Sequence, residues 1–345
     1  MELLKALVTA EVDNSVLEKE FDGKVVFDYD GYNVNHEVLD HNRLKKIIGD
    51  YDILICEYDT ISDDILHAAN KLKLIICCRG GVKSVIDLEC ASSLGIIVCN
   101  NAGRNANSLA DLVMGFILDM TRNITLTNNL IHSRILTSDT STKPGEYKDV
   151  IWGLNDESPF RKYRGKSINE MILGIVGFGH TGKMVARKAN LFDMKVIAFD
   201  SHSDMIDFPD YVKSVPLDVL IKESDIISMH CNVDETSRGM CDKQFFTTMK
   251  DGSYFINTAR GELVVEEDLI GSLASGKLAG AALDVTAKEP ISAGSPLLDA
   301  PNLIITPHIA GSSRDVQVKG TAQVVDSLNS FINCEKPKLA VVYPN

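Results

Sequence analysis

Short apolar runs alternate with amphipathic stretches along most of the chain. In the first hundred residues, apolar runs predict strands over residues 3–9, 24–27, 51–56, 72–78 and 96–99. Between them, apolar residues at helical spacing predict helices over residues 36–48, 62–71 and 87–94. Strands that alternate with helices in this way are typical of βαβ units and a mostly parallel sheet.

The alternation continues after residue 170. Apolar runs there predict strands over residues 171–176, 195–199, 226–230, 254–257, 280–285, 303–306 and 339–343. Between the two series, a long helix is predicted over residues 105–132, followed by a polar surface excursion over residues 138–165; a further helix is predicted over residues 313–334. The pattern therefore predicts two α/β domains. Only the second contains a glycine-rich turn after its first strand, so we expect it to hold a nucleotide.

That turn is Gly177-Phe-Gly179-His-Thr-Gly182, between a predicted strand and a predicted helix. The next strand ends on Asp200, 18 residues after Gly182. Strand, turn, helix, strand and acid occur in the order that a dinucleotide site requires. Gly177 would permit the tight turn, Gly179 the close approach of a pyrophosphate, and Gly182 the packing of the helix on the sheet. The helix N-terminus would offer N–H groups to the phosphates.

The turn alone is weak evidence, because glycine-rich turns also serve packing. The strands and the terminal acid around it favour a nucleotide. Asp200 is placed to accept hydrogen bonds from the adenosine ribose diol, and its carboxylate would repel a 2′-phosphate. The following Ser201-His202-Ser203 supplies no arginine to neutralise that phosphate. The sequence therefore predicts NAD rather than NADP.

Composition narrows the class of protein. The 345 residues, 45% hydrophobic and 24% charged, allow two domains of an ordinary soluble protein. A net charge of −13 without basic runs argues against nucleic acid or an anionic membrane as a partner. No apolar run reaches spanning length, and the acidic N-terminus does not resemble a signal peptide. The eight cysteines form no Cys-x-x-Cys pair, so we expect reduced thiols, a cytoplasmic location and no metal site.

Three later segments carry reactive side chains, each just after a predicted strand, where ligands bind in open α/β sheets. Arg260 precedes a glycine and can present a fork of donors to a carboxylate, although a surface ion pair is the commoner fate of an arginine. Asp284 ends an apolar strand, where burial without a partner is costly. Glu289 precedes a proline and His308 follows one.

Histidine is the natural proton donor and acceptor near neutral pH, and a carboxylate partner stabilises its charged form. A lone histidine is more often structural than catalytic. The hypothesis of catalysis therefore depends on His308, Glu289 and Arg260 occurring together, downstream of a dinucleotide turn.

These segments together resemble the D-isomer-specific 2-hydroxyacid dehydrogenase family over nearly the whole chain, with phosphoglycerate dehydrogenases among the similar enzymes. The motifs that carry the resemblance are Arg79-Gly-Gly-Val82, Asn101-Ala-Gly103-Arg-Asn105, the Gly177 turn, Ser228-Met-His230, Asn257-Thr-Ala-Arg260-Gly261, Leu283-Asp-Val285, Glu289-Pro290 and Thr306-Pro-His308.

The resemblance implies an α/β fold with two Rossmann-like or flavodoxin-like, doubly wound parallel-sheet domains. The NAD-binding Rossmann domain, residues 104–313, would be inserted into a substrate domain of residues 1–103 and 314–345. Family members are usually homodimers built through the NAD-binding domain, which suits the long helix that begins near Asn105.

The resemblance also implies individual roles. His308 would be the general acid/base, Glu289 its carboxylate partner, and Arg260 the clamp on the substrate's carboxylate and carbonyl. Asp284 would help to position the nicotinamide. The substrate's carboxylate would be held from the other domain at Arg79, Gly80, Gly81 and Val82. The implied cofactor-binding residues are Gly177, Phe178, Gly179, His180, Thr181, Gly182, Asp200, His230, Cys231, Asn232, Ser237, Thr258, Ala259, Asp284 and Gly311.

The implied reaction is reversible hydride transfer between NADH and a 2-oxo acid, with His308 protonating the nascent alkoxide and Arg260 stabilising its charge. Formate dehydrogenases are similar overall but pair the histidine with glutamine, so Glu289 argues against that activity. A phosphite-type dehydrogenase and an NAD(H)-sensing, corepressor-like binding protein remain as alternatives.

Some positions depart from the family's pattern. Asn232 stands where many relatives have proline, and Asp111 where many have glutamate. By similarity to phosphoglycerate dehydrogenases, an arginine for the substrate phosphate is expected near Glu57-Tyr58-Asp59. That segment contains none and is acidic, which argues against 3-phosphoglycerate and leaves the identity of the 2-oxo acid open.

Overall fold

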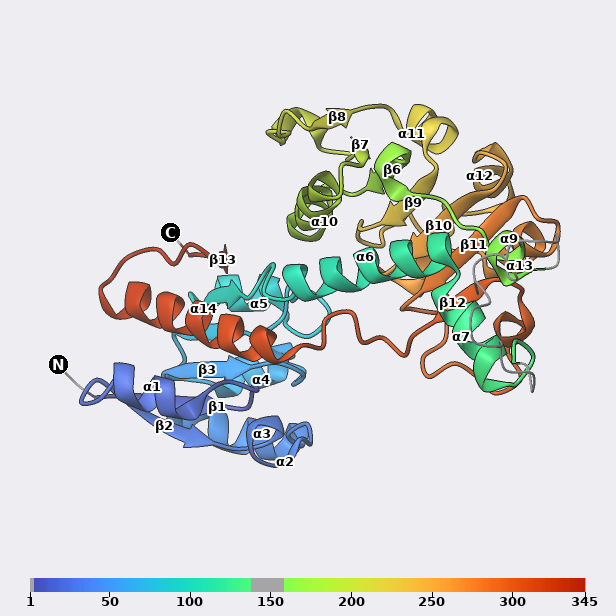
Figure 1. Cartoon of the computed structure of the whole chain (residues 1–345). Coiled ribbons are helices and arrows are strands. Elements are labelled where there is room, and N and C mark those ends of the chain that lie inside the picture. Colours follow the sequence, from blue (N-terminus) through green and yellow to red (C-terminus); the bar gives the residue numbers. More distant parts are fainter. Residues whose placement is uncertain (1–2, 138–157, 345) are drawn as a thin grey trace. The chain divides into compact units, whose positions relative to one another are not determined.

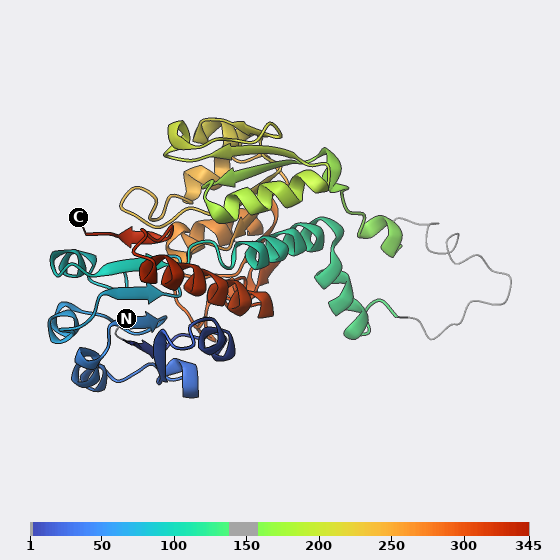
Figure 2. The same cartoon turned by 90° about the vertical axis from the view of Figure 1, so that its left-hand side faces the viewer.

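The chain folds into two compact units. The computed structural model describes residues 3–137 and 158–344. Unit 1 comprises Met1–Asn105 and Ser313–Asn345, and unit 2 comprises Ala106–Ser312. Unit 1 is therefore discontinuous in sequence, as the colour order along the chain shows in Figure 1 and Figure 2. Each unit is built on a largely parallel sheet, which confirms the α/β class predicted from the alternating pattern.

The described sheet of unit 1 has the strand order β13-β5-β4-β3-β1-β2. Strands β1 to β5 are parallel, whereas β13 pairs antiparallel with β5, so the sheet is mostly parallel, as predicted, with one antiparallel edge strand. Antiparallel pairing lets the short C-terminal segment join the edge without another crossover. The strands are β1 (Leu4–Val8), β2 (Val25–Tyr29), β3 (Ile53–Cys56), β4 (Leu74–Cys77), β5 (Ile97–Asn100) and β13 (Ala340–Val342).

Helices cover both faces of this sheet, because successive strand residues point to opposite sides. Ala6 packs in a core with residues of α1 and α14, and Leu7 in a second core with residues of α3, α4 and α5. The helices are α1 (Asn14–Glu20), α2 (Tyr32–Asn35), α3 (His41–Ile47), α4 (Asp63–Ala68), α5 (Leu88–Ser93) and α14 (Arg314–Ile332). The helix predicted over residues 36–48 begins only at His41, because the Asp40 carboxylate caps it by accepting a hydrogen bond from Arg43 N at 3.0 Å.

The described sheet of unit 2 is parallel throughout and has the order β12-β11-β10-β9-β6-β7-β8. The chain order reverses at β6, which lies between β7 and β9. Such a switch point is where open α/β sheets bind ligands. The strands are β6 (Ile172–Val176), β7 (Lys195–Phe199), β8 (Val212–Ser214), β9 (Ile226–Met229), β10 (Ser253–Asn257), β11 (Leu278–Leu283) and β12 (Leu303–Ile305). The short β8 was not predicted, because its three residues carry little apolar signal.

One face of the unit 2 sheet is covered by α6 and α10, and the other by α11, α12 and α13, so both faces carry a buried apolar core. Figure 1 labels these helices around the strands of unit 2. They are α6 (Ala106–Arg122), α10 (His180–Leu191), α11 (Leu217–Glu223), α12 (Lys243–Thr248) and α13 (Glu266–Ala274). Single 3-10 turns are η1 (Ile48–Asp50), η2 (Ile168–Glu170), η3 (Ser203–Met205), η4 (Gly261–Leu263) and η5 (Pro296–Asp299).

The long helix predicted over residues 105–132 is broken. Helix α6 ends at Arg122, Asn123 adopts the left-handed conformation with φ of 55°, and α7 (Ile124–His132) begins directly after it. Asparagine tolerates this conformation better than most residues, and Asp119 accepts a hydrogen bond from Thr125 N at 2.7 Å across the break. Apolar spacing alone cannot reveal such a break, because it continues through both helices.

Residues 138–157 of the predicted surface excursion lie outside the described residues, and its remainder contains α9 (Pro159–Lys162). Within the described parts of the chain, no helix combines the length and apolarity needed to cross a membrane.

Candidate functional site

The turn between β6 and α10 contains three glycines. The fold requires glycine at two of these positions, whereas the packing of the protein does not explain the glycine at the third. Gly177 has φ of 94°, and a Cβ there would lie 2.6 Å from Cys231 N. A Cβ on Gly182 would lie 2.2 Å from the carbonyl oxygen of Gly177. Both positions therefore require glycine for the fold itself. A Cβ on Gly179 would meet no atom within 4 Å, so the space beside it is open.

Unpaired donors face this open space at the start of α10. The N–H groups of Gly179, His180 and Thr181 donate to no acceptor in the described residues, and no side chain caps the helix. Free N–H groups and the positive end of the helix dipole together favour an anion. The absent Cβ and the unpaired donors fit the pyrophosphate of a dinucleotide.

Asp200, at the end of β7, is tied to the same turn. Its Oδ2 accepts a hydrogen bond from Phe178 N at 2.7 Å, and its Oδ1 accepts one from His202 N at 2.9 Å. The side chain keeps 17% of its surface exposed, so its remaining lone pairs are accessible. This arrangement fits the predicted acceptor for a ribose diol.

The segment after β9 packs under the glycine turn. Burial lowers the pKa of His230 to about 3, so its ring is neutral near pH 7, and its Nε2 lies 2.8 Å from Ser228 Oγ. Burial likewise raises the pKa of Cys231 to about 11, so this cysteine is a thiol rather than a thiolate. Neither side chain is therefore suited to exchange protons at neutral pH, and it is the backbone of His230 and Cys231 that lies against Gly177.

The loop after β9 continues with Asn232, and hydrogen bonds of Ser237 hold its two ends together. Ser237 Oγ donates a hydrogen bond to the carbonyl oxygen of Asn232 at 2.9 Å and accepts one from Asp234 N at 2.8 Å. The Asp234 carboxylate in turn accepts a hydrogen bond from Ser237 N at 2.9 Å. The loop is thus held by its own side chains at the carboxyl end of β9.

The segment after β10 is shaped by the first residue of the motif Asn257-Thr-Ala-Arg260-Gly261, which was not among the predicted site residues. Asn257 is fully buried; its Nδ2 donates to the carbonyl oxygen of Arg260 at 2.8 Å, and its Oδ1 accepts from Ala259 N at 3.0 Å. A polar residue at the end of an apolar strand was the available signal. Thr258 Oγ1 is buried without a hydrogen-bond partner in the described residues. A buried hydroxyl of this kind is costly unless a ligand satisfies it.

Gly261 brings this segment against the next one. A Cβ on Gly261 would lie 2.1 Å from the backbone of Thr286, so the loops after β10 and β11 are in direct backbone contact. Arg260, just before it, is exposed and donates to the carbonyl oxygen of Ala259 at 2.6 Å. No ion pair to Arg260 occurs in the described residues, so the surface ion pair considered for it is not found there.

Asp284 anchors the segment that carries His308. Asp284 is 1% exposed; its Oδ1 accepts hydrogen bonds from Thr306 Oγ1 at 2.5 Å and Ile309 N at 2.9 Å, and its Oδ2 accepts one from Ala310 N at 2.9 Å. Its carbonyl oxygen also accepts from His308 N at 2.8 Å. The buried carboxylate is therefore committed to the loop after β12, a role that the sequence analysis did not foresee.

His308 and Glu289 are in direct contact. His308 Nδ1 lies 2.7 Å from Glu289 Oε2, and Glu289 Oε1 accepts a hydrogen bond from Thr286 N at 3.2 Å. His308 has φ of 56°, in the left-handed region that non-glycine residues rarely occupy. The hydrogen bonds to Asp284 hold it there. His308 is 51% exposed, so its other ring nitrogen can reach a ligand. Gly311, a little further along the same segment, is partly buried.

In unit 1, the predicted substrate loop also presents unpaired donors. The N–H groups of Gly80, Gly81 and Val82 donate to no acceptor in the described part of the chain. The loop is held by its carbonyl groups instead: Asn100 Nδ2 donates to Gly80 O at 2.7 Å, and Asn101 N donates to Arg79 O at 3.0 Å. Three neighbouring free N–H groups are suited to bind a carboxylate.

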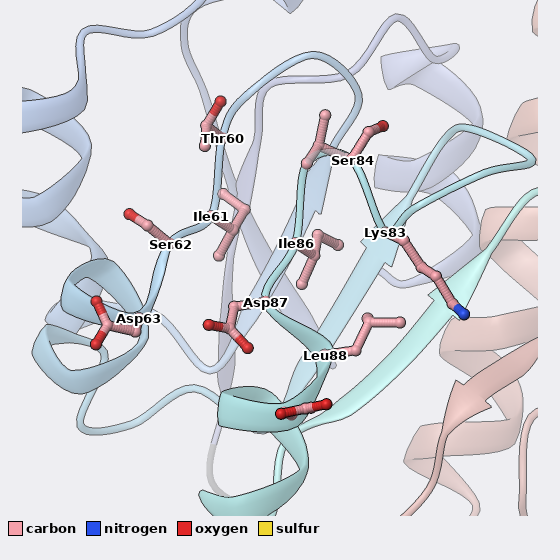
Figure 3. Close-up of a pocket in the computed structure, with 11 residues that line it drawn as sticks. Thr60, Ile61, Ser62, Asp63, Lys83, Ser84, Ile86, Asp87 and Leu88 are labelled. Carbon is pink, nitrogen blue, oxygen red and sulfur yellow. The ribbon is translucent and has the colours of Figure 1, made fainter. Parts of the chain in front are cut away.

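A cavity of about 730 Å³ in unit 1 contains none of the predicted site residues. It lies between residues 60–63 and residues 83–89, where Ile61 and Ile86 form an isolated bridge (Figure 3). Its charged lining is mainly acidic, with Lys83 as its cation. An anionic substrate is therefore not favoured there. In the described residues, no cluster of three metal-ligating side chains occurs, and all eight cysteines are free.

Substitutions can distinguish the glycines that the fold requires, Gly177 and Gly182, from Gly179, which borders open space. Gly179→Ala should raise the Kd for NADH at least about tenfold, because its methyl group enters the open space, while leaving the melting temperature unchanged. Gly182→Ala should destabilise the fold by about 1 to 3 kcal/mol, because its methyl group meets backbone. Fluorescence titration with NADH and thermal unfolding measure the two effects. Unchanged NADH affinity in Gly179→Ala would show that the open space holds no part of the cofactor.

Comparisons with known proteins agree with this geometry. Residues 115–310 match the model of the D-isomer specific 2-hydroxyacid dehydrogenase, NAD binding domain. The hydroxypyruvate reductase of Thermotoga maritima is 33% identical over 318 residues, 91% of this chain and 95% of the relative. The D-3-phosphoglycerate dehydrogenase of Archaeoglobus fulgidus is 31% identical over 81% of this chain and 49% of its own length.

Among solved structures, the TT0316 protein from Thermus thermophilus superposes with a TM-score of 0.77 at 27% identity, over 98% of this chain and 100% of that one. The family match lies inside unit 2, the unit that contains the glycine turn. The chain therefore belongs to the D-isomer-specific 2-hydroxyacid dehydrogenase family, NAD-dependent oxidoreductases that act on the CH–OH group of hydroxy acids.

Proposed function

We propose that this protein reversibly interconverts a 2-oxo acid and its D-2-hydroxy acid with NAD(H), and that His308 is the general acid/base. The observation that carries the proposal is the 2.7 Å contact between His308 Nδ1 and Glu289 Oε2. With Nδ1–H donating to the carboxylate, Nε2 is left to exchange a proton with the substrate oxygen. Glu289 stabilises the imidazolium form, which donates that proton during reduction.

NADH, when bound, supplies a hydride to C2 of the 2-oxo acid. During reduction, His308 gives its proton to the carbonyl oxygen as negative charge develops there. Arg260 offers guanidinium donors to the substrate's carboxylate and to that developing charge. In the oxidation direction, His308 accepts the hydroxyl proton, and the contact with Glu289 stabilises the resulting charge.

We also assign roles to the two units. Unit 2 is proposed as the NAD-binding domain and unit 1 as the substrate domain, in which the N–H groups of Gly80, Gly81 and Val82 bind the carboxylate. For the cofactor, we propose that the turn at Gly179 holds the pyrophosphate and Asp200 the ribose. Its remaining contacts are proposed at Phe178, His180, Thr181, His230, Cys231, Asn232, Ser237, Thr258, Ala259 and Gly311, with Gly177 and Gly182 shaping the turn.

The alternatives drawn from the sequence, a corepressor-like NAD(H) sensor and a formate- or phosphite-type dehydrogenase, receive no support from the relatives named above. Hydroxypyruvate is the first substrate to assay, because relatives from Thermotoga maritima and Blautia hydrogenotrophica are named hydroxypyruvate reductases. A cytoplasmic location stays a proposal; the eight free cysteines are consistent with a reducing compartment.

His308→Ala tests the acid/base assignment. We expect turnover of NADH with a 2-oxo acid to fall by about 10² to 10⁴, because the proposed proton donor is removed, while NADH affinity persists. Stopped-flow absorbance at saturating substrate measures the first quantity, and fluorescence titration the second. His67→Ala, at an exposed histidine of unit 1, is the matched control and should keep full activity. Turnover that survives in His308→Ala would exclude His308 as the acid/base.

We further propose a homodimer that forms through unit 2, with α7 at the interface. Helix α7 has no buried residue, and two of its apolar side chains one heptad apart, Ile124 and Ile131, are 53% and 52% exposed. Ile135, just after the helix, is 66% exposed. A helix whose apolar face is left this open is typical of a surface that another protein covers.

The double variant Ile124→Asp/Ile131→Asp should convert the dimer to a monomer, because charged groups would be buried in the interface. Sedimentation velocity ultracentrifugation measures the mass. Leu191→Asp is the control, since Leu191 is 75% exposed on α10 and should leave the dimer intact. A wild-type protein that sediments as a monomer, or a double variant that remains dimeric, would contradict this interface.

A further inference from the structure

The carboxyl end of β3 does not present the acidic surface that Glu57-Tyr58-Asp59 suggests. The carboxylate of Glu57 is 3% exposed and forms an ion pair with Arg104, whose side chain is 16% exposed. Asp59 is 1% exposed, and its carboxylate accepts a hydrogen bond from Thr9 Oγ1 at 2.5 Å. Both acids are therefore buried and used by the fold. Glu57 and Asp59 therefore give no reason to expect that this segment repels an anionic substrate.

Tyr58 is the side chain of this segment that reaches the surface, with 41% of its area exposed. Tyr32 packs edge-on against its ring, with centroids 4.7 Å apart and planes at 65°. The guanidinium carbon of Arg79 lies 5.6 Å from the centroid of the same ring, a distance typical of a cation–π contact. Partial burial and the nearby Glu57 raise the pKa of Tyr58 to about 12, so its hydroxyl stays protonated at neutral pH.

Arg79 is positioned by this ring but not neutralised. No ion pair to Arg79 occurs within residues 3–137 and 158–344. Arg104, the other arginine near this segment, is already paired with Glu57. A positioned arginine that retains its donors is suited to bind a planar or tetrahedral anion through two hydrogen bonds.

The position of Arg79 connects it to the proposed substrate loop. It directly precedes Gly80, Gly81 and Val82, whose free N–H groups are the proposed site for the C1 carboxylate. The loop thus offers backbone donors at Gly80, Gly81 and Val82, and its first residue offers a guanidinium near the ring of Tyr58. Two adjacent anion sites favour a small molecule that carries two anionic groups.

We propose that Arg79 and Tyr58 bind a second anionic group of the substrate, a carboxylate or a phosphate, so that the preferred substrates are 2-oxo acids with two acidic groups. The proposal depends on the dehydrogenase function proposed above. Arg79 acts as a specificity residue, and Tyr58 positions its guanidinium and donates one hydrogen bond.

Steady-state kinetics with NADH can test the proposal on the full-length protein. Pyruvate and hydroxypyruvate represent acids with one anionic group, oxaloacetate and 2-oxoglutarate represent a second carboxylate, and 3-phosphohydroxypyruvate represents a second phosphate. We expect kcat/KM of the wild-type protein to be at least about tenfold higher for one of the last three than for the first two, the gain of a charge-assisted contact. The doubly anionic acid with the highest kcat/KM then identifies the second anionic group as a carboxylate or a phosphate.

Substitutions of Arg79 and Tyr58 test whether these residues cause the preference for doubly anionic acids. Arg79→Gln should lower kcat/KM for the doubly anionic acids at least about tenfold more than for the singly anionic acids, and Arg79→Lys should restore part of the difference. Tyr58→Leu, which removes the ring under Arg79, should also reduce the preference, and Tyr58→Phe should reduce it less. Lys83→Gln removes an exposed positive charge from the same loop region and should leave the preference unchanged.

Two results would overturn the proposal while leaving the dehydrogenase function intact. One is a wild-type protein that turns over singly anionic acids as well as doubly anionic ones. The other is an Arg79→Gln variant that loses the same factor for both classes, because Arg79 would then contact the C1 carboxylate alone. If the wild-type protein oxidises NADH only with bulkier, singly anionic 2-oxo acids, the inference alone fails; if it oxidises NADH with no 2-oxo acid, the proposed function fails and the inference fails with it.

Discussion

The buried carboxylate of Asp284 makes the hydrogen bonds on which the candidate site of unit 2 depends. It accepts hydrogen bonds from Thr306 Oγ1, Ile309 N and Ala310 N, and its backbone carbonyl accepts one from His308 N. A buried carboxylate is costly unless its oxygens are satisfied, so the loop and the acid stabilise each other. The result is a histidine held in a backbone conformation that it would not otherwise prefer, with its ring directed at Glu289.

Close backbone contacts assemble the rest of the site around that anchor. Gly261 packs on the backbone of Thr286, which brings the loop carrying Arg260 beside the segment that leads to Glu289. Gly177 packs in the same way on Cys231, which places the glycine turn against the loop after β9. In a parallel sheet, the carboxyl ends of neighbouring strands meet at one edge, and these glycines let the loops at that edge touch. Residues far apart in sequence are thereby brought into one region of unit 2.

Much of the fold could be predicted, because strands and helices repeat their apolar pattern over several residues; β7 (Lys195–Phe199) matches its predicted bounds. Features that depend on single contacts could not be predicted. Asn123 breaks a helix whose apolar spacing continues, and β13 joins its sheet antiparallel. Among the candidate site residues, the contact between His308 and Glu289 joins two that the sequence suggested. The anchoring by Asp284 and the pairing of Glu57 with Arg104 depend on burial, which a sequence pattern does not reveal.

We infer that Asp284 acts by holding His308 in place. The most direct measurement is the single-turnover rate of hydride transfer in Asp284→Asn, with NADH affinity measured on the same protein. Asparagine keeps one oxygen acceptor but loses the charge and the acceptor for Ala310 N. Hydride transfer should slow at least about tenfold while the Kd for NADH changes little, because the loop no longer fixes His308, the proposed acid/base. A wild-type transfer rate, or a loss confined to NADH binding, would contradict it.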